Sequence, residues 1–336
     1  MNGRGVLRGI APACQRFYPL LLAAGLVGVL YLVARDPLID AEAVMVAGSP
    51  GAPDSAALHA LTTGPHMDGF GSWSPDGSRL AFMRDGRIWV AAADGSSARP
   101  VSSGGPAGWD VSPVWRPDGR QIAFARLGDS SALVMSVDPT TTGETILVTE
   151  DEPVGYLAWA PRGESLWYTK AHTLMRLDLA SSRRSVVLSV GQAQELLAGG
   201  LTISRDGRTI IVGIGDRRDQ SVAYDLWTLD LSRSAPEPQR LTREGGIMPA
   251  LDAKGRRLVY RNSRRAQGIY LMELASHRTH RVLSDASGTM YFHPAFTPDG
   301  KRLVVSRLQL GTVGQGRELR LVSHLFTLPV GDGGRN

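Results

Sequence analysis

A short motif built around Asp-Gly, or a close variant of it, recurs six times along this 336-residue chain. Its three clearest copies are Trp73-Ser74-Pro75-Asp76-Gly77, Trp115-Arg116-Pro117-Asp118-Gly119 and Phe296-Thr297-Pro298-Asp299-Gly300. The glycines of all six copies fall at 77, 119, 163, 207, 255 and 300, so that neighbouring copies lie 42, 44, 44, 48 and 45 residues apart. A fixed period in this range is typical of a propeller or a solenoid.

Each repeat contains the pattern of four β-strands. Asp-Gly supplies the positive φ angles of a tight hairpin turn, which joins a first strand ending at Trp73 to a second over 79–83. The second strand places alternate apolar residues, such as Leu80 and Phe82, on one face. A third strand follows at 88–90, and a fourth ends in an aliphatic residue plus Ser or Thr, as at Val101-Ser102. The chain's 39 Gly and 20 Pro fit this frequent reversal of direction. The sequence therefore predicts an all-β fold, a six-bladed β-propeller.

The last repeat lacks its fourth strand, because the chain runs through Pro329 into a glycine-rich end after the third strand. Leu61-Thr62, before the first repeat, has the form of a fourth strand. We expect this N-terminal segment to complete the sixth blade, which would remove the open edge of the ring. The alternative is that Leu61-Thr62 matches the pattern of the fourth strand by chance.

An apolar stretch precedes the repeats. Residues 17–34 carry no charge, and 18 helical residues at about 1.5 Å each just cross a bilayer core of roughly 30 Å. Arg4, Arg8 and Arg16 precede the stretch, which predicts a cytoplasmic N-terminus. We expect a cytoplasmic tail at 1–16, a transmembrane helix at 17–34, a linker at 35–57, the propeller at 58–330 and a C-terminal tail at 331–336. A cleaved signal peptide is the alternative, and both place the propeller outside the cytoplasm.

Charge and cysteine content exclude several classes of protein. Residues 1–35 contain four basic residues and no acid, which leaves 33 basic against 32 acidic residues in the remainder. The body is thus electrically balanced, and we expect no nucleic-acid partner. Sixteen residues before the anchor cannot hold a DNA-binding domain. Cys14 is the only cysteine, which excludes an intramolecular disulfide and a cysteine-based metal site.

The run Trp-Ser-Pro-Asp-Gly-x-x-Leu-Ala-Phe at 73–82, with Ile88-Trp89 and Val101-Ser102 after it, resembles the WD-like repeat of the TolB family of six-bladed propellers. The resemblance covers roughly residues 58–330. It implies a propeller fold and, less specifically, a protein-binding role in the cell envelope. Residues 36–57 form only a short segment where the family has an N-terminal α/β domain, so docking to the Tol-Pal system does not carry over. The repeat is also similar to that of prolyl-oligopeptidase-type peptidases, but no Gly-x-Ser-x-Gly nucleophile motif occurs here.

Residues that could carry chemistry are scattered over the repeats. The pair His277 and His280 falls in a turn region, and Asp76, Asp118, Asp206 and Asp299 precede turn glycines, so we expect solvated and turn-forming roles for these residues. We therefore predict no catalytic residue, no metal site and no cofactor. Residues 254–265 carry six basic residues and no acid; a solvated blade edge is favoured over a phosphate or anionic-lipid contact.

The residues three positions before the end of each first strand are the most informative. They are Phe70, Ser112, Tyr156, Gly200, Met248 and His293. In a six-fold ring these residues approach one mouth of the central channel, with Trp109, Asp110, Tyr291 and Phe292 close behind. We expect this aromatic rim to bind a protein or peptide; the equal alternative is that it plugs the channel.

We therefore predict a non-catalytic, membrane-tethered propeller on the periplasmic side of the inner membrane. Its predicted binding residues are Phe70, Trp109, Asp110, Tyr156, Met248, Tyr291, Phe292 and His293. The alternative is a periplasmic enzyme or a small-ligand sensor that uses the channel mouth.

Overall fold

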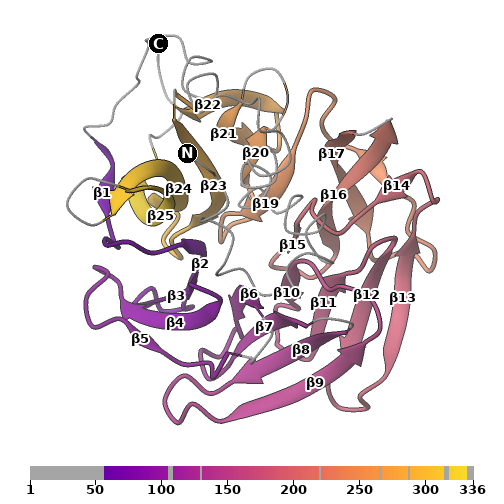
Figure 1. The fold of residues 1–336 in the computed structure, drawn as a ribbon. Helices are drawn as coiled ribbons and strands as arrows, with labels where there is room; N and C mark the ends of the chain where they lie inside the picture. The colour runs from indigo at the N-terminus through magenta and orange to yellow at the C-terminus, as the bar shows by residue number, and fades with distance from the viewer. Residues whose placement is uncertain are drawn as a thin grey trace, which may run out of the picture.

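The computed structural model describes residues 57–104, 109–128, 131–218, 221–262, 264, 267–286, 288–313 and 318–330. These residues form six antiparallel sheets around a central axis (Figure 1). The predicted all-β, six-bladed β-propeller is confirmed.

Each sheet is one blade, and the strands nearest the axis are β2, β6, β10, β15, β19 and β23 (Figure 1). The first three blades are β2 (Asp68–Trp73), β3 (Arg79–Arg84), β4 (Arg87–Ala92) and β5 (Arg99–Pro100); β6 (Trp109–Trp115), β7 (Ile122–Leu127), β8 (Ala132–Val137) and β9 (Glu144–Glu150); and β10 (Leu157–Trp159), β11 (Ser165–Thr169), β12 (Thr173–Asp178) and β13 (Arg184–Ser189). The fourth blade has β14 (Gln194–Glu195), β15 (Leu201–Ile203), β16 (Thr209–Arg218), β17 (Ser221–Asp230) and β18 (Gln239–Arg240). The fifth has β19 (Ile247–Leu251), β20 (Arg257–Asn262), β21 (Gly268–Glu273) and β22 (Arg278–Ser284), and the sixth has β23 (Thr289–Phe296), β24 (Arg302–Val313), β25 (Glu318–Pro329) and β1 (His59–Ala60).

The ring is closed by the N-terminal strand, as the sequence predicts. β1 pairs with β25, with His59 opposite Thr327 and Ala60 opposite Phe326. The Leu61 amide donates to the Leu325 carbonyl, and the Thr62 hydroxyl accepts from the Leu325 amide at 2.9 Å. Ser102 and Thr242 accept the amides of Ile88 and Leu226 in the same way. The recurring Ser or Thr thus has a physical role, because its hydroxyl satisfies an amide of the third strand.

Neighbouring blades are joined at the Asp-Gly turns. The indole of Trp115 donates to the Ser72 carbonyl, and that of Trp159 to the Val114 carbonyl, each at 3.1 Å. Both indoles therefore bond to the preceding blade. The predicted turn-forming role of the aspartates is confirmed, since Asp76, Asp118, Asp206 and Asp299 each accept a backbone amide two residues ahead.

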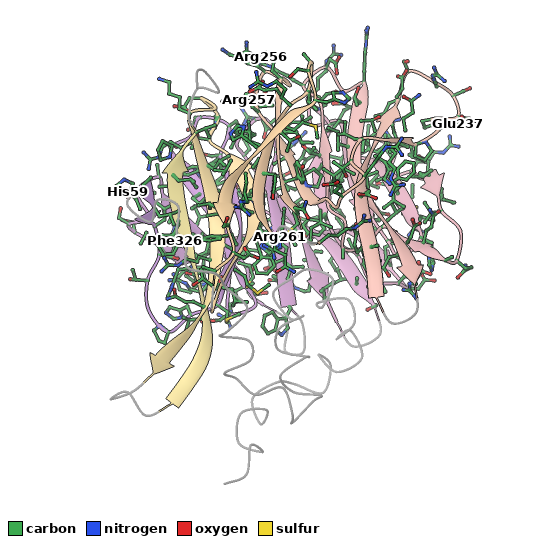
Figure 2. All side chains as sticks on the ribbon, turned by 90° about the horizontal axis from the view of Figure 1, so that it is seen from above. His59, Glu237, Arg256, Arg257, Arg261 and Phe326 are labelled. Atoms are coloured by element: carbon green, nitrogen blue, oxygen red, sulfur yellow. The ribbon has the colours of Figure 1, made fainter. Side chains whose placement is uncertain are left out.

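The two ends of the ring differ. We call the end with the Asp-Gly turns the turn face, and the end where the first strands begin and the second and third strands connect the hairpin face. Two of the strand connections at the hairpin face are long hairpins of paired strands. β16 and β17 pair as far as Arg218 and Ser221, and β24 and β25 as far as Val313 and Glu318. The β24–β25 hairpin extends well beyond the body of the propeller (Figure 2).

The predicted tail at 1–16, the anchor at 17–34, nearly all of the linker and the tail at 331–336 lie outside the described residues. Within the described part of the chain, no helix has both the length and the apolar character needed to cross a membrane.

Candidate site at the closed end of the channel

The six residues predicted to form a ring do meet at the axis. Phe70, Ser112, Tyr156, Met248 and His293 line one central cavity of about 370 Å³, and Gly200 packs against Met248. Five of the six positions have a left-handed backbone, with φ between +48° and +77°; Tyr156 is the exception. In four blades the strand pairing shifts register at this point. Such a β-bulge re-aims a side chain, and here the bulged side chains line the channel.

Gly200 is required at its position. Its φ is +77°, and a Cβ there would lie 2.8 Å from the Met248 Cα. The other left-handed residues in the ring are not glycine, and each costs of order 1–3 kcal/mol that the surrounding packing must offset.

The aromatic members of the ring form a plug. The Phe70 ring stacks on His293 with centroids 3.8 Å apart, and Tyr156 lies 5.9 Å from Phe70 and 6.3 Å from His293. Phe70 is 8% exposed, His293 6% and Phe292 2%. These three side chains are therefore buried, because they pack against one another near the narrow axis. The alternative interpretation, a channel plug, describes their packing.

Polar groups lie within this apolar plug. The Tyr224 hydroxyl donates to Glu195, which also pairs with Arg217 at 2.8 Å. Burial and then the adjacent Glu195 charge raise the pKa of Tyr224 well above its usual value. Burial alone raises the pKa of Tyr156. Both phenols therefore stay neutral across the physiological pH range.

The residues predicted to lie close behind the ring have different surroundings. Trp109 begins β6, is partly exposed, and lies with its ring near Gly86. Asp110 is fully buried and forms a two-pronged ion pair with Arg126 at 2.6 and 2.9 Å. Tyr291 is buried at the start of β23. Of these three residues, Trp109 is the one that is partly exposed.

Buried ion pairs at the hairpin face are the feature that sequence reasoning missed. Examples are Asp68 with Arg84 at 2.6 Å, Glu150 with Lys170 at 2.8 Å and Arg261 with Asp285 at 2.7 Å. An alignment of the repeats contains the signal for these pairs. Arg84 and Arg126 each stand seven residues after the turn glycine of their repeat, and Asp68 and Asp110 each stand nine residues before it. In the first two blades this spacing places acid and base opposite each other on paired strands.

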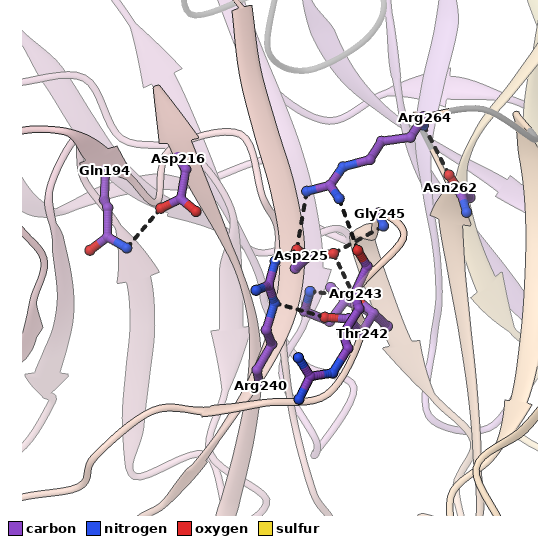
Figure 3. A network of polar contacts seen from close by, with 10 residues as sticks. Gln194, Asp216, Asp225, Arg240, Thr242, Arg243, Gly245, Asn262 and Arg264 are labelled. Atoms are coloured by element: carbon purple, nitrogen blue, oxygen red, sulfur yellow. Dashed lines mark hydrogen bonds and ion pairs between the residues drawn. The ribbon is translucent and has the colours of Figure 1, made fainter. Parts of the chain in front are cut away.

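The fourth and fifth blades share such a network (Figure 3). Asp225 is buried and accepts from Arg240, from Arg264 at 3.1 Å and from the Gly245 amide at 2.9 Å. Arg264 thus connects the end of β20 to β17 of the preceding blade.

Glu150 shows how burial and partners compete. Burial raises the pKa of this carboxyl, but Lys170, Tyr168 and Arg184 together outweigh burial, so the pKa lies below its usual value. Glu150 is therefore ionised at neutral pH and links the end of β9 to the third blade.

Three arginines of the basic stretch at 254–265 form ion pairs within the protein. Arg257 pairs with Asp252, Arg261 with Asp285 and Arg264 with Asp225. Arg261 is 2% exposed, so the predicted solvated edge is wrong at this residue (Figure 2). Lys254 and Arg256 remain exposed, and Arg265 lies outside the described residues.

The described histidines do not converge on the channel. His277 and His280 are exposed, as predicted, and His66 pairs with Asp85 at 2.7 Å on the hairpin face. His293 alone lies in the plug, 3.5 Å from the Ser306 hydroxyl. No group of three or more His, Cys, Asp or Glu residues suited to a metal occurs in the described ranges.

The hairpin face carries a partly exposed apolar surface outside the plug. Met67 and Met290 pack against the cluster that contains Met248 and Phe292, and Trp109 packs against the neighbouring core. Val222, on the β16–β17 hairpin, is 37% exposed. We call Met67, Trp109, Met290 and Val222 the hairpin-face surface.

Comparison with known proteins supports the fold. A TolB structure from Acinetobacter baumannii has a TM-score of 0.54 and 16% identity, over 84% of this chain and 66% of that chain. A putative TolB from Agrobacterium tumefaciens has a TM-score of 0.57 and 16% identity, over 80% of this chain and 92% of that chain. This chain has the six-bladed β-propeller fold of these TolB structures. At these identities the likeness concerns the fold alone.

Sequence comparison adds a short match to a TolB. The Tol-Pal system protein TolB of Anaeromyxobacter dehalogenans is 49% identical over 57 residues, which are 16% of this chain and 13% of that protein. The match therefore spans well under two thirds of that relative. No protein-family profile matches the chain. The TolB-like fold also occurs in enzymes: a gluconolactonase from Xanthomonas campestris has a TM-score of 0.59 and 14% identity, over 83% of this chain and 93% of that chain.

Proposed function

We propose that this TolB-like propeller is a membrane-tethered protein-interaction module whose hairpin face binds a protein or peptide of the cell envelope. The observation that carries the proposal is the construction of that face. The β24–β25 hairpin stands out from it, and the hairpin-face surface offers Met and Trp side chains beside a buried, plugged core. Aromatic and Met side chains over a well-packed centre are typical of protein interfaces.

The plug residues serve this proposal indirectly. Phe70, Tyr156, Met248, Phe292 and His293 support the surface, because they fill the axis beneath it. Of the sequence-predicted binding residues, Trp109 is the one that we propose contacts the partner directly. Met67 and Met290 join it.

Capture of a partner from crosslinked membranes tests the role of this surface. The double variant Trp109→Ala and Met290→Ala should keep the fold and weaken partner binding by roughly 1–4 kcal/mol, the range of an interface anchor. Ile146→Ala, which truncates an exposed side chain on β9, is the matched control and should bind like the wild type. A folded double variant with unchanged capture would remove the site from this face.

We also propose that residues 17–34 anchor the chain in the inner membrane with the propeller in the periplasm. The uncharged stretch and the three arginines before it support this proposal. An alkaline phosphatase fusion after Asn336 should be active and remain with the membrane. An inactive fusion would contradict the orientation, and release of a protein that lacks residues 1–34 would favour a cleaved signal peptide.

A periplasmic enzyme or small-ligand sensor is the second candidate. The likeness of the fold to a gluconolactonase and the single histidine in the plug favour it. A metal bound near His293 in purified protein would support it over the interaction module.

A further inference from the structure

We infer a binding site for a small organic carboxylate in the cleft between the third and fourth blades, away from the hairpin face. The cleft has a volume of about 400 Å³, within the range of small-ligand pockets. Trp167, Arg176 and Val186 of the third blade form one wall. Leu231 and Pro236, from β17's end and the loop after it, belong to the other.

The repeat itself supplies the comparison that makes this cleft unusual. Trp167 and Arg176 are paired across β11 and β12. In the other five blades the residue at the position of Trp167 is small or aliphatic: Ala81, Ala123, Ile211, Val259 and Val304. The residue at the position of Arg176 is uncharged: Val90, Ser136, Thr228, Leu271 and Thr327. The fold therefore needs neither a tryptophan nor an arginine at these positions.

Both side chains carry hydrogen-bond donors that the described residues do not satisfy. Trp167 is 6% exposed, and its indole Nε1 is buried without a partner. The Arg176 Nε is likewise buried and unpaired, and the guanidinium lies 5.7 Å from the centre of the Trp167 ring. A buried donor without a partner costs about 1–3 kcal/mol of stability. A ligand that enters the cleft and accepts hydrogen bonds from these two donors removes that cost. Its binding free energy is therefore more favourable than that of an ordinary surface contact.

Charge and shape define the ligand class. Glu164 and Arg233 also line the cleft, and Asp178 lies near enough for Arg176 to lower its pKa, but Arg176 forms no ion pair with an acid in the described residues. A carboxylate is the geometric match of its guanidinium. Ser185 and Ser234 also line the cleft and can supply hydroxyls, whereas Val186, 56% exposed, and Pro236 present apolar surface from opposite walls. The ligand is thus a carboxylate joined to an apolar body.

Arg116 is a natural control. It also lies over a tryptophan, Trp159, at 5.6 Å and has an unpaired Nε, but Asp118 stands 3.6 Å from it and it lines none of the cavities described above.

Titration of the full ¹⁵N-labelled chain with benzoate tests the site. The indole signal that disappears in Trp167→Phe should shift and saturate with benzoate. Neutral benzamide, and acetate without the apolar body, should bind at least about tenfold more weakly, or 1.4 kcal/mol. Threonine is the residue at the position of Arg176 in the fourth and sixth blades. Arg176→Thr should weaken benzoate binding by the same factor and leave the melting temperature unchanged. Arg116→Thr should bind benzoate like the wild type.

If Arg176→Thr unfolds, Arg176→Gln keeps the length of the side chain and should show the same loss. An unmoved Trp167 signal, equal binding of benzamide, or benzoate binding unaffected by either Arg176 variant would overturn the inference. None of these outcomes depends on the hairpin-face partner.

Discussion

Phe292 illustrates what alignment of the repeats could and could not predict. The repeat places Phe292 close behind the ring at the axis, and in the structure the centre of its ring lies 6.1 Å from that of His293. Its exposure did not follow from the sequence, because burial depends on how closely six inner strands approach one another. The left-handed backbone conformation at Phe70, Ser112, Met248 and His293 could not be predicted from the sequence either, because none of these residues is glycine.

Burial of Phe292 leads to a prediction about stability. Phe292→Ala should lower the free energy of unfolding by about 3–5 kcal/mol, because it leaves a cavity in the plug. Ile146→Ala, at a 57% exposed position, should change it by less than about 0.5 kcal/mol. Urea unfolding measures both. Equal, small effects would mean that the plug is loosely packed and that Phe292 is available to a partner after all.

The buried ion pairs escaped prediction for another reason. Asp68 and Arg84 are 16 residues apart, and their contact depends on the register of β2 against β3, which bulges between Gly69 and Ser72. The turn aspartates, by contrast, bond within two residues, so their roles could be read from the local sequence.

The Asp-Gly turns predict how stability depends on pH. A hydrogen bond from the Ser74 hydroxyl, followed by bonds from the Ser78 amide and hydroxyl, lowers the pKa of Asp76 to about 2. Side-chain hydrogen bonds lower the pKa of Asp206 and Asp299 in the same way. A carboxyl whose pKa is lower in the folded than in the unfolded protein stabilises the fold. This contribution is complete at pH values above the unfolded-state pKa of about 3.9 and is lost as the pH falls toward 2.

The free energy of unfolding should therefore fall between about pH 4 and pH 2, and Asp76→Asn should make that fall shallower. Urea titrations at several pH values measure both. A stability that stays constant down to pH 2.5 would contradict these roles of the turn aspartates.

The closing strand gives a prediction with a matched control. Gly95 has φ +84°, and a Cβ there would lie 1.9 Å from the Leu61 carbonyl oxygen, next to β1. Gly255 has φ +63° and nothing within 4 Å of such an atom. Gly255→Ala should lower the free energy of unfolding by about 1–2 kcal/mol, because the backbone there is strained for alanine. Gly95→Ala should lower it by an additional ~1–3 kcal/mol, because the new methyl group also displaces the closing strand. Equal costs in urea unfolding would mean that the contact between Gly95 and Leu61 contributes little to closure.

For the molecule as a whole, sequence predicted the blade number, the closure and the ring of residues at the axis. All three follow from a period, a turn motif and a two-residue strand signal. Sequence also predicted the end of the ring that we propose binds a partner, but it assigned binding to the ring residues themselves and not to Met67, Met290 and Val222. The surface at this end depends on the hairpins that β16 forms with β17 and β24 with β25, whose turns carry no Asp-Gly or Asn-Gly signal, and on Met67 and Met290, which stay partly exposed where they pack against the plug.

The interaction proposal rests on the hairpin face, and site-directed photocrosslinking in intact cells probes it most directly. A benzoylphenylalanine at position 222 lies on the β16–β17 hairpin of this face, whereas one at position 146 occupies an exposed apolar position on β9, at the outer edge of the second blade. We predict a discrete protein adduct in the membrane fraction from position 222 and none from position 146. Absence of an adduct at 222, or the same adducts from both positions, would contradict binding of a protein partner by the hairpin face.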